Sequence, residues 1–79
     1  MKLVYDPRYN IAYFCLHEKV AEVNTLHLSD EINVDIAPDG TVYGIELLNA
    51  NDQLQSEDQE NLVIVNEALG RRLEVPLGK

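Results

Sequence analysis

Apolar and polar residues alternate without error in one segment at the centre of the chain. Residues 31–36 read Glu-Ile-Asn-Val-Asp-Ile, and a second, mainly apolar segment at residues 41–48 follows after a short turn and can pair back onto it. A period of two is typical of a half-buried strand, because successive side chains of a strand point to opposite faces of the sheet. The pattern predicts an antiparallel hairpin whose strands are these two segments.

The connection between the two strands leaves two pairing registers open. An even-length loop places the apolar residues of both strands on one face, and Asn33, Asp35 and Glu46 on the other. A three-residue loop at 38–40 suits the turn chemistry better, with proline in its favoured place and glycine in the left-handed conformation. That loop would shift the pairing by one residue and place Ile32 opposite Glu46. We expect an even-length loop, because it keeps the apolar face intact.

Three segments precede this hairpin. Residues 3–5 form a short predicted strand, which Asp6 and Pro7 close in a turn. Residues 11–16 are continuously apolar, which predicts a strand that is covered on both faces and lies near the centre of the sheet. Residues 20–28 carry a weaker pattern, which fits a short edge strand or an extended connection.

The C-terminal third begins with a polar, acidic stretch at residues 49–61, which we interpret as a loop with room for one helical turn. Ser56 and Gln59 have the spacing of a capping box. Residues 62–65 and 71–75 flank a turn at Gly70 and predict a second hairpin. The alternative is a helix over 57–73. We favour the hairpin because consecutive β-branched residues suit strands.

These segments predict a mainly β fold, a small antiparallel meander of five or six strands in one domain that spans residues 1–79. A β core covers residues 1–50, the acidic loop 51–61 and the second hairpin 62–77. The single cysteine excludes an internal disulfide. A chain of this length buries only about 60% of its unfolded surface. We therefore expect a second copy to cover the apolar face of the sheet in a homodimer.

The charge of the chain narrows the classes of partner. The formal net charge is −8, from 14 acidic and 6 basic residues. This charge disfavours direct binding to nucleic acid or to an anionic membrane, and it would steer a basic protein toward the chain. The sequence shows no signal-peptide pattern and no stretch of roughly 20 apolar residues. We expect a cytoplasmic protein.

The turn between the central strands also matches part of a calcium-binding loop. Asp35, Asp39, Gly40 and Glu46 fall on positions 1, 5, 6 and 12 of the EF-hand pattern. Position 3 is Ala37, which removes a ligand, and the flanking segments have the period of strands rather than helices. We interpret the segment as a hairpin turn and predict no metal.

The remaining reactive side chains form no recognisable catalytic set. Cys15 lies in the most apolar segment, so we expect a small core residue rather than a nucleophile. His17 and His27 are far apart in sequence, and we expect them at the surface or in an interface. We predict neither catalytic residues nor a cofactor. The predicted structural turn residues are Asp6, Pro7, Asp39, Gly40 and Gly44.

Several short motifs together resemble a family of short bacterial and archaeal proteins that is known only as a domain of unknown function. The resemblance covers about residues 2–50. The matching residues are Tyr5-Asp6, Asn10 to Tyr13, Val34-Asp35, Asp39-Gly40 and Gly44 to Leu48. The family usually has a single aspartate before the alanine, where this chain has Asn10-Ile11. The resemblance implies a compact β-rich domain and no catalytic residue. Some members are encoded beside small toxins, which implies an antitoxin role.

The sequence leaves two classes of function, and we rank a third class below them. The first is a self-associating protein-interaction module without catalytic activity. The second is an antitoxin-like, acidic neutraliser of a basic partner protein, whose candidate interaction residues are Asp35, Glu46, Glu57, Asp58 and Glu60. The third is binding of calcium or another metal through Asp35, Asp39 and Glu46.

Overall fold

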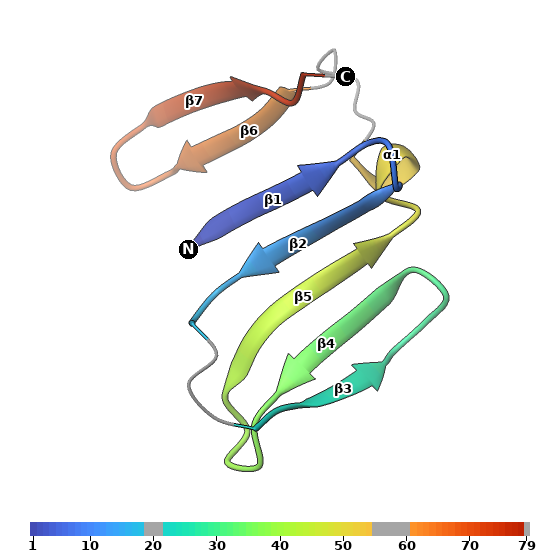
Figure 1. Ribbon diagram of the computed structural model, residues 1–79. Coiled ribbons are helices and arrows are strands. Elements are labelled where there is room, and N and C mark those ends of the chain that lie inside the picture. Colours follow the sequence, from blue (N-terminus) through green and yellow to red (C-terminus); the bar gives the residue numbers. More distant parts are fainter. Residues whose placement is uncertain (19–21, 55–60, 79) are drawn as a thin grey trace.

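The computed structural model describes residues 1–18, 22–54 and 61–78, which form seven strands and one short helix (Figure 1). The prediction of a mainly β protein is confirmed. In chain order the elements are β1 (Lys2–Asp6), β2 (Ile11–Cys15), β3 (Asn24–His27), β4 (Ile32–Ile36), β5 (Val42–Leu48), α1 (Ala50–Gln53), β6 (Asn61–Asn66) and β7 (Arg71–Pro76).

The first five strands form one antiparallel sheet in the order β1-β2-β5-β4-β3. The chain crosses from β2 past two positions of the sheet to β3, and then returns strand by strand until β5 pairs with β2 (Figure 1). This order is that of a Greek key rather than the predicted simple meander. The apolar strand β2 lies between β1 and β5 and not at the centre of the sheet.

The turn between β4 and β5 resolves the conflict between turn chemistry and apolar pairing. The N–H of Ala37 donates to the carbonyl of Thr41 at 2.9 Å, so the loop is the three residues 38–40, and the even-length prediction is wrong. Ile32 nevertheless lies opposite Leu47 and Val34 opposite Ile45, as the even-length register requires, whereas Ile36 does not keep that register. A β-bulge absorbs the one-residue shift, because Ile36 pairs with Val42 while Asp35 pairs with Gly44.

The C-terminal strands β6 and β7 form a separate two-stranded antiparallel hairpin, as predicted (Figure 1). The expected helical turn is α1, at the start of the predicted loop. The Ser56 to Gln59 capping box lies outside the described residues. No helix in the described part of the chain is long and apolar enough to cross a membrane.

The five-stranded sheet has two unlike faces, which the pairing register defines. The polar face carries Tyr13, Asn33, Asp35 and Glu46 on its inner strands, as the alternation predicted for the last three. The opposite, apolar face carries residues from all five strands: Leu3, Tyr5, Ala12, Phe14, Leu26, Ile32, Val34, Ile45 and Leu47.

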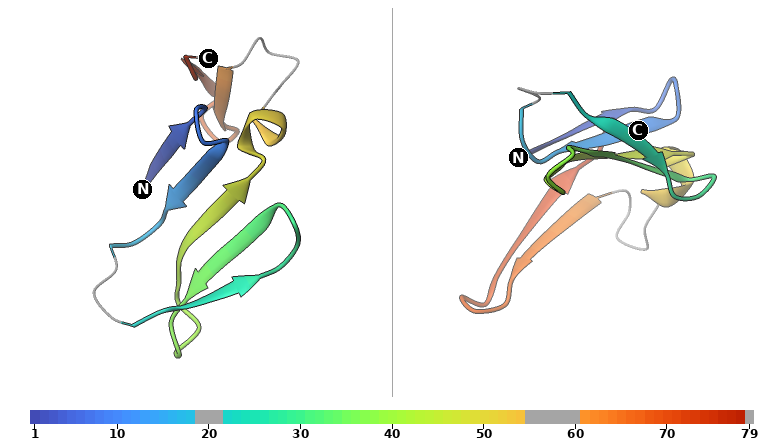
Figure 2. Two further views of the ribbon diagram at one scale, coloured as in Figure 1. Left: turned by 45° about the vertical axis from the view of Figure 1, so that its right-hand side comes forward. Right: turned by 90° about the horizontal axis from the view of Figure 1, so that it is seen from below.

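The protein has almost no closed core. The buried side chains within the described residues are Ala12, Ala37, Ala50 and Asp35, and no large side chain is fully buried. Strand β2 is therefore not covered on both faces, and its first residue Ile11 is 38% exposed. The sheet forms a single layer, and the hairpin stands at an angle to it beyond β1 (Figure 2).

Helix α1 closes the end of the sheet where β5 leaves it. The N–H of Ala50 donates to the carbonyl of Asn10 at 3.1 Å, and the Tyr5 hydroxyl donates to Oδ1 of Asn51 at 2.7 Å. Both Asn10 and Asn49 have left-handed backbone conformations. Asparagine tolerates this conformation better than most residues do. The two asparagine turns therefore allow the helix to pack against the ends of β1 and β2.

The left-handed Gly40 generates a prediction for the stability of the central hairpin. Its φ is +92°, and nothing lies near the position of an added Cβ, so the effect of Gly40→Ala comes from the backbone alone. We expect Gly40→Ala to lower the free energy of unfolding by about 1–2 kcal/mol, as measured by chemical denaturation. Gly78→Ala is the control, because Gly78 also has a positive φ but lies beyond the last strand. Equal effects of the two changes would contradict the role of the turn.

Candidate functional site

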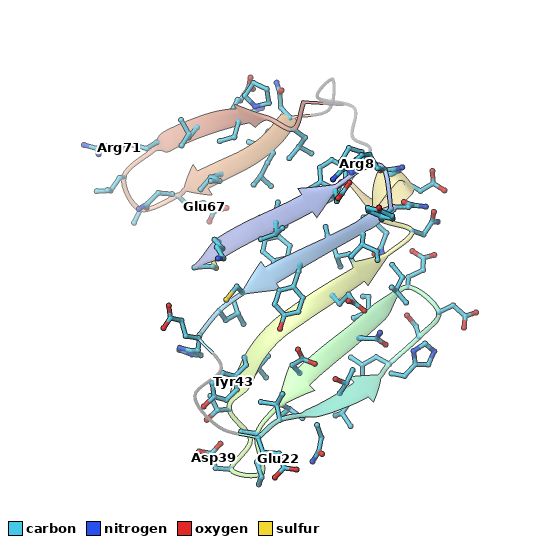
Figure 3. All side chains as sticks on the ribbon, viewed as in Figure 1. Arg8, Glu22, Asp39, Tyr43, Glu67 and Arg71 are labelled. Carbon is cyan, nitrogen blue, oxygen red and sulfur yellow. The ribbon has the colours of Figure 1, made fainter. Side chains whose placement is uncertain are left out.

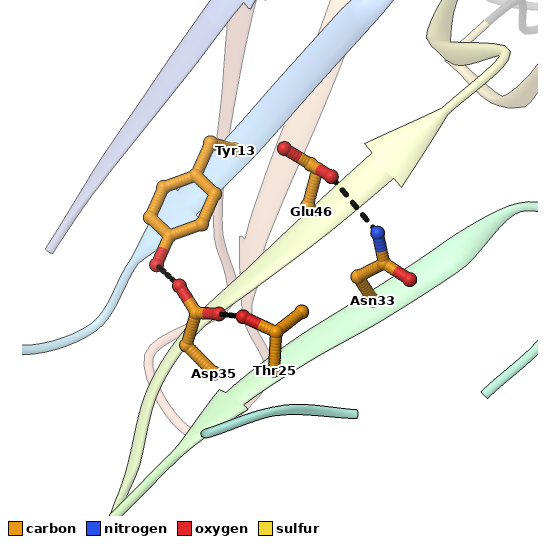
Figure 4. A pocket seen from close by; sticks show the side chains of 5 residues that line it. All are labelled: Tyr13, Thr25, Asn33, Asp35 and Glu46. Carbon is orange, nitrogen blue, oxygen red and sulfur yellow. Dashed lines mark hydrogen bonds between the residues drawn. The ribbon is translucent and has the colours of Figure 1, made fainter. Parts of the chain in front are cut away.

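The polar face of the sheet is hollowed into a pocket of about 470 Å³. Its lining comes from four adjacent strands, β2, β5, β4 and β3, and consists of Tyr13, Glu46, Asn33, Asp35 and Thr25 (Figure 4). The structure thus brings together two of the predicted interaction residues, Asp35 and Glu46. Their side chains lie on one face because both strands keep the register that the alternation predicts.

Asp35 is the buried centre of this pocket. Asp35 is only 8% exposed. The Tyr13 hydroxyl donates to its Oδ2 and the Thr25 hydroxyl donates to its Oδ1, both at 2.7 Å (Figure 4). Hydrogen bonds to a charged acceptor are among the strong ones, so the carboxylate ties β2 and β3 to β4. Its first role is structural.

Tyr13 reaches Asp35 only because the strand between them carries a glycine. Gly44 lies on β5 between the two residues, opposite Asp35 on one side and Cys15 on the other. A Cβ built on Gly44 would lie 2.1 Å from the Tyr13 hydroxyl oxygen and 2.3 Å from the ring carbon that bears it. The tyrosine therefore lies across the bare backbone of Gly44. The predicted turn role of Gly44 is wrong, since the residue lies within a strand.

Glu46 belongs to a second group of polar contacts on the same face. Nδ2 of Asn33 donates to Oε1 of Glu46 at 3.0 Å. The carbonyl oxygen of the Asn33 side chain then faces Nδ1 of His27, at 2.8 Å, so this histidine nitrogen is the donor. Nε2 of His27 lies 3.9 Å from Asp30. These contacts run from β5 through β4 to the edge strand β3.

Asp39 lies at the tip of the β4–β5 turn, away from this pocket (Figure 3). Its Oδ1 accepts the N–H of Thr41 at 2.9 Å, and hydrogen bonds from Thr41 hold the pKa of the carboxyl below its usual value. Strands rather than helices flank this turn. The hairpin interpretation is therefore confirmed. Within the described residues, no group of three or more histidine, cysteine or acidic side chains is placed to hold a metal ion.

The other turn candidates act as the sequence predicts. Asp6 ends β1, and its carboxylate accepts the backbone N–H of Arg8 at 3.0 Å and the Arg8 guanidinium at 2.9 Å. The Arg8 side chain is the largest cause that lowers the pKa of Asp6. Pro7 follows in the turn between β1 and β2. The predicted interaction residues Glu57, Asp58 and Glu60 lie outside the described residues.

Cys15 and the histidines occupy partly exposed positions. Cys15 lies on the polar side of β2 and is not a core residue, because its register partners are Lys2 and Gly44. The apolar segment does not reveal this, since alternate residues of β2 point to opposite faces. His17 is exposed and packs edge-on against the Tyr43 ring, with 6.0 Å between ring centroids.

Sequence reasoning missed Tyr13 and Thr25 as members of the site. In the sequence Tyr13 stands out only as part of the motifs of the family resemblance, and Thr25 lies in the weakest predicted strand. One signal was present in the sequence, because Gly44 interrupts an otherwise good strand. A glycine inside a strand often marks a place where another group approaches the backbone closely.

Tyr13 and Gly44 generate a prediction about coupled substitutions. We expect Gly44→Ala to lower the free energy of unfolding by about 1–3 kcal/mol, because the added methyl group displaces the tyrosine from Asp35. In a Tyr13→Ala background the same change should have little effect, since the ring that collides is gone. Chemical denaturation of the four proteins in this cycle measures the coupling. Additive effects would show that the ring does not depend on the glycine.

Comparison with known proteins identifies the family of this chain. No curated protein and no solved structure matches the chain. A family profile described as "Protein of unknown function (DUF2283)" matches residues 2–51, which include the whole five-stranded sheet and the start of α1. The hairpin of β6 and β7 lies outside the matched residues. Because the match covers more than half of its residues, the chain belongs to this family of unknown function, DUF2283.

Proposed function

We propose that this protein is a self-associating interaction module without catalytic activity, in which a second copy covers the apolar face of the five-stranded sheet. The support is the chemistry of that face. It carries side chains of Leu3, Phe14, Val34 and Ile45 across four adjacent strands, and all four remain partly exposed. Water contact with such a continuous apolar surface is unfavourable, at roughly 25 cal/mol per Å².

The surface area of the chain is the observation that carries this proposal. The accessible area is 5886 Å² for a mass of 8.9 kDa. A compact monomer of this mass exposes about 4,800 Å², so roughly 1,100 Å² is in excess. A stable protein interface buries about 800 Å² on each partner. The excess is thus of the size that one self-complementary interface would remove.

The overall dimensions of the chain agree with this excess of accessible surface. The Cα radius of gyration is 14.1 Å, and the shortest of the three principal extents is 19 Å. A compact domain of this length has a radius of gyration of about 12 Å. The chain is flat because its sheet has one layer where β proteins usually have two. A second sheet packed face to face, about 10 Å away, would supply the missing layer.

Charge determines which face suits a second copy. Two copies carry a net charge of −8 each and repel one another, so an interface between them must keep carboxylates out. The polar face presents Asp35 and Glu46, whereas the apolar face has no charged side chain among its paired residues. Association through the apolar face separates the charges and buries the apolar area.

Leu26 and Val4 provide a matched test of this interface. Leu26 is 46% exposed on edge strand β3 and faces the apolar side, and Val4 is 51% exposed on edge strand β1 and faces the polar side. We expect Leu26→Lys to raise the dissociation constant of the dimer at least tenfold, because it places a charge in the interface. Val4→Lys should leave the dissociation constant within about twofold. Light scattering and sedimentation over a range of concentrations measure both.

A wild-type chain that remains at 8.9 kDa at high concentration would refute the proposal. Equal weakening by Leu26→Lys and Val4→Lys would also count against it, because the effect would then be one of general stability rather than of the apolar face. Far-ultraviolet circular dichroism of each variant checks that the strands still form.

The pocket on the polar face favours a second candidate function, an acidic neutraliser of a basic partner protein. Its support is the placement of Asp35 and Glu46 in one hollow beside the Tyr13 ring. Carboxylates and an aromatic ring are the groups that accept a lysine or arginine side chain. This role uses the face that self-association leaves free, so the two candidates are compatible.

An oligolysine peptide can probe this second role. We expect its binding to weaken as salt rises and to perturb amide signals around Thr25 and Asn33. Glu46→Gln should lower the affinity by about 0.2–1 kcal/mol, which is the range of partly exposed ion pairs. Glu67→Gln removes the same charge from the β6–β7 turn and should have less effect. Signals that change equally over the whole surface, or equal losses in the two variants, would contradict a specific site.

A further inference from the structure

The hairpin of β6 and β7 is amphipathic, although it stands apart from the sheet. Its register places Leu62 opposite Val75 and Ile64 opposite Leu73, so these four apolar side chains share one face. Ile64 is 50% and Leu73 is 59% exposed. The other face carries Val63 and Val65, and also an ion pair of 3.0 Å between Arg72 and Glu74. The four residues Leu62, Ile64, Leu73 and Val75 are called the arm face below.

A hairpin of two strands is only marginally stable in water without further packing. Within the described residues β6 and β7 pack mainly on one another, and no extensive packing joins them to the five-stranded sheet. The arm face therefore leaves apolar side chains in contact with water, as the apolar face of the sheet does. Both surfaces belong to one chain, and both are rich in leucine and β-branched residues.

The direction of the hairpin determines what can cover it. Figure 4 looks onto the polar face, with Tyr13 and Glu46 in front, and the faint strands of the hairpin pass behind the sheet. Seen from below, the hairpin extends from the plane of the sheet on one side only (Figure 2). The hairpin thus reaches into the space beside the apolar face, where the sheet of a second copy would lie.

We propose that the hairpin is an arm that packs its arm face against the second copy of the chain. This inference rests on the proposed self-association, and it adds a second surface to that interface. In a twofold dimer each hairpin would contact the sheet of the other chain, so the apolar face of each sheet meets both a sheet and an arm. The arrangement completes the layer that a single chain lacks.

Charge supports this choice of partner. Arg71 lies at the turn end of the hairpin, on the same side of β7 as Leu73 (Figure 3). A cation at the border of the arm face complements a partner whose net charge is −8. An arm that packed against a basic protein would place Arg71 against like charge. A second copy of this acidic chain therefore suits the arm better than a basic protein does.

A matched pair of substitutions tests the arm. Leu73 is 59% exposed on the arm face, and Val65 is 55% exposed on the opposite face of the same hairpin. We expect Leu73→Lys to raise the dissociation constant of the dimer at least tenfold, and Val65→Lys to change it by less than about twofold. Sedimentation equilibrium measures both. If Leu26→Lys disrupts the dimer and Leu73→Lys has no effect on it, the arm inference is wrong and the proposed function still holds. A monomeric wild-type chain would overturn both.

An isotope-filtered NOE measurement on the wild-type dimer shows which chain the arm touches. Uniformly ¹³C-labelled and unlabelled chains are mixed after dissociation, and contacts between labelled and unlabelled protons are recorded. We expect the methyl groups of Ile64 and Leu73 to contact apolar-face protons of the other chain. The ring of Phe14 gives the clearest signal, since it is the only phenylalanine. Contacts of the arm methyl groups with their own chain alone would refute the inference.

Discussion

The rest of the structure depends on one constraint, which is that a single-layer sheet cannot bury its own apolar face. The buried side chains in the described ranges are three alanines and one aspartate, so hydrophobic burial inside one chain is small. Hydrogen bonding between five antiparallel strands holds the sheet together, but each strand keeps one row of apolar side chains in contact with water. The proposed association with a second copy would remove that surface, and the single cysteine excludes an internal disulfide as another source of stability.

The polar face is organised around a close approach of side chain and backbone. Tyr13 crosses Gly44 to reach Asp35, and Thr25 binds the same carboxylate from the edge strand. Strands β2, β3 and β4 are therefore joined through side chains on the polar face. This network connects the strands without depending on apolar packing. It also explains why a buried carboxylate is tolerated, since both of its oxygens accept hydrogen bonds.

The bulge in the β4–β5 hairpin links the turn to both faces. Proline and glycine in residues 38–40 favour a three-residue loop, and apolar pairing favours the register of an even loop. One extra residue in β5 satisfies both, and the bulge lies directly beside Gly44. The local sequence was therefore not in conflict with the fold. The two requirements act on different parts of the hairpin, and a bulge separates them at the cost of one unpaired residue.

The sequence alone determined the elements whose signals are local. The alternation at residues 31–36, the turn at Gly40 and the β-branched run in β6 each predicted the observed structure, because side-chain period and turn chemistry act within a few residues. The strand order, the partly exposed position of Cys15 and the inclusion of Tyr13 and Thr25 in the pocket came only from the tertiary structure. These features depend on which strands become neighbours. The crossover that brings β5 beside β2 is a long-range pairing, which no local pattern encodes.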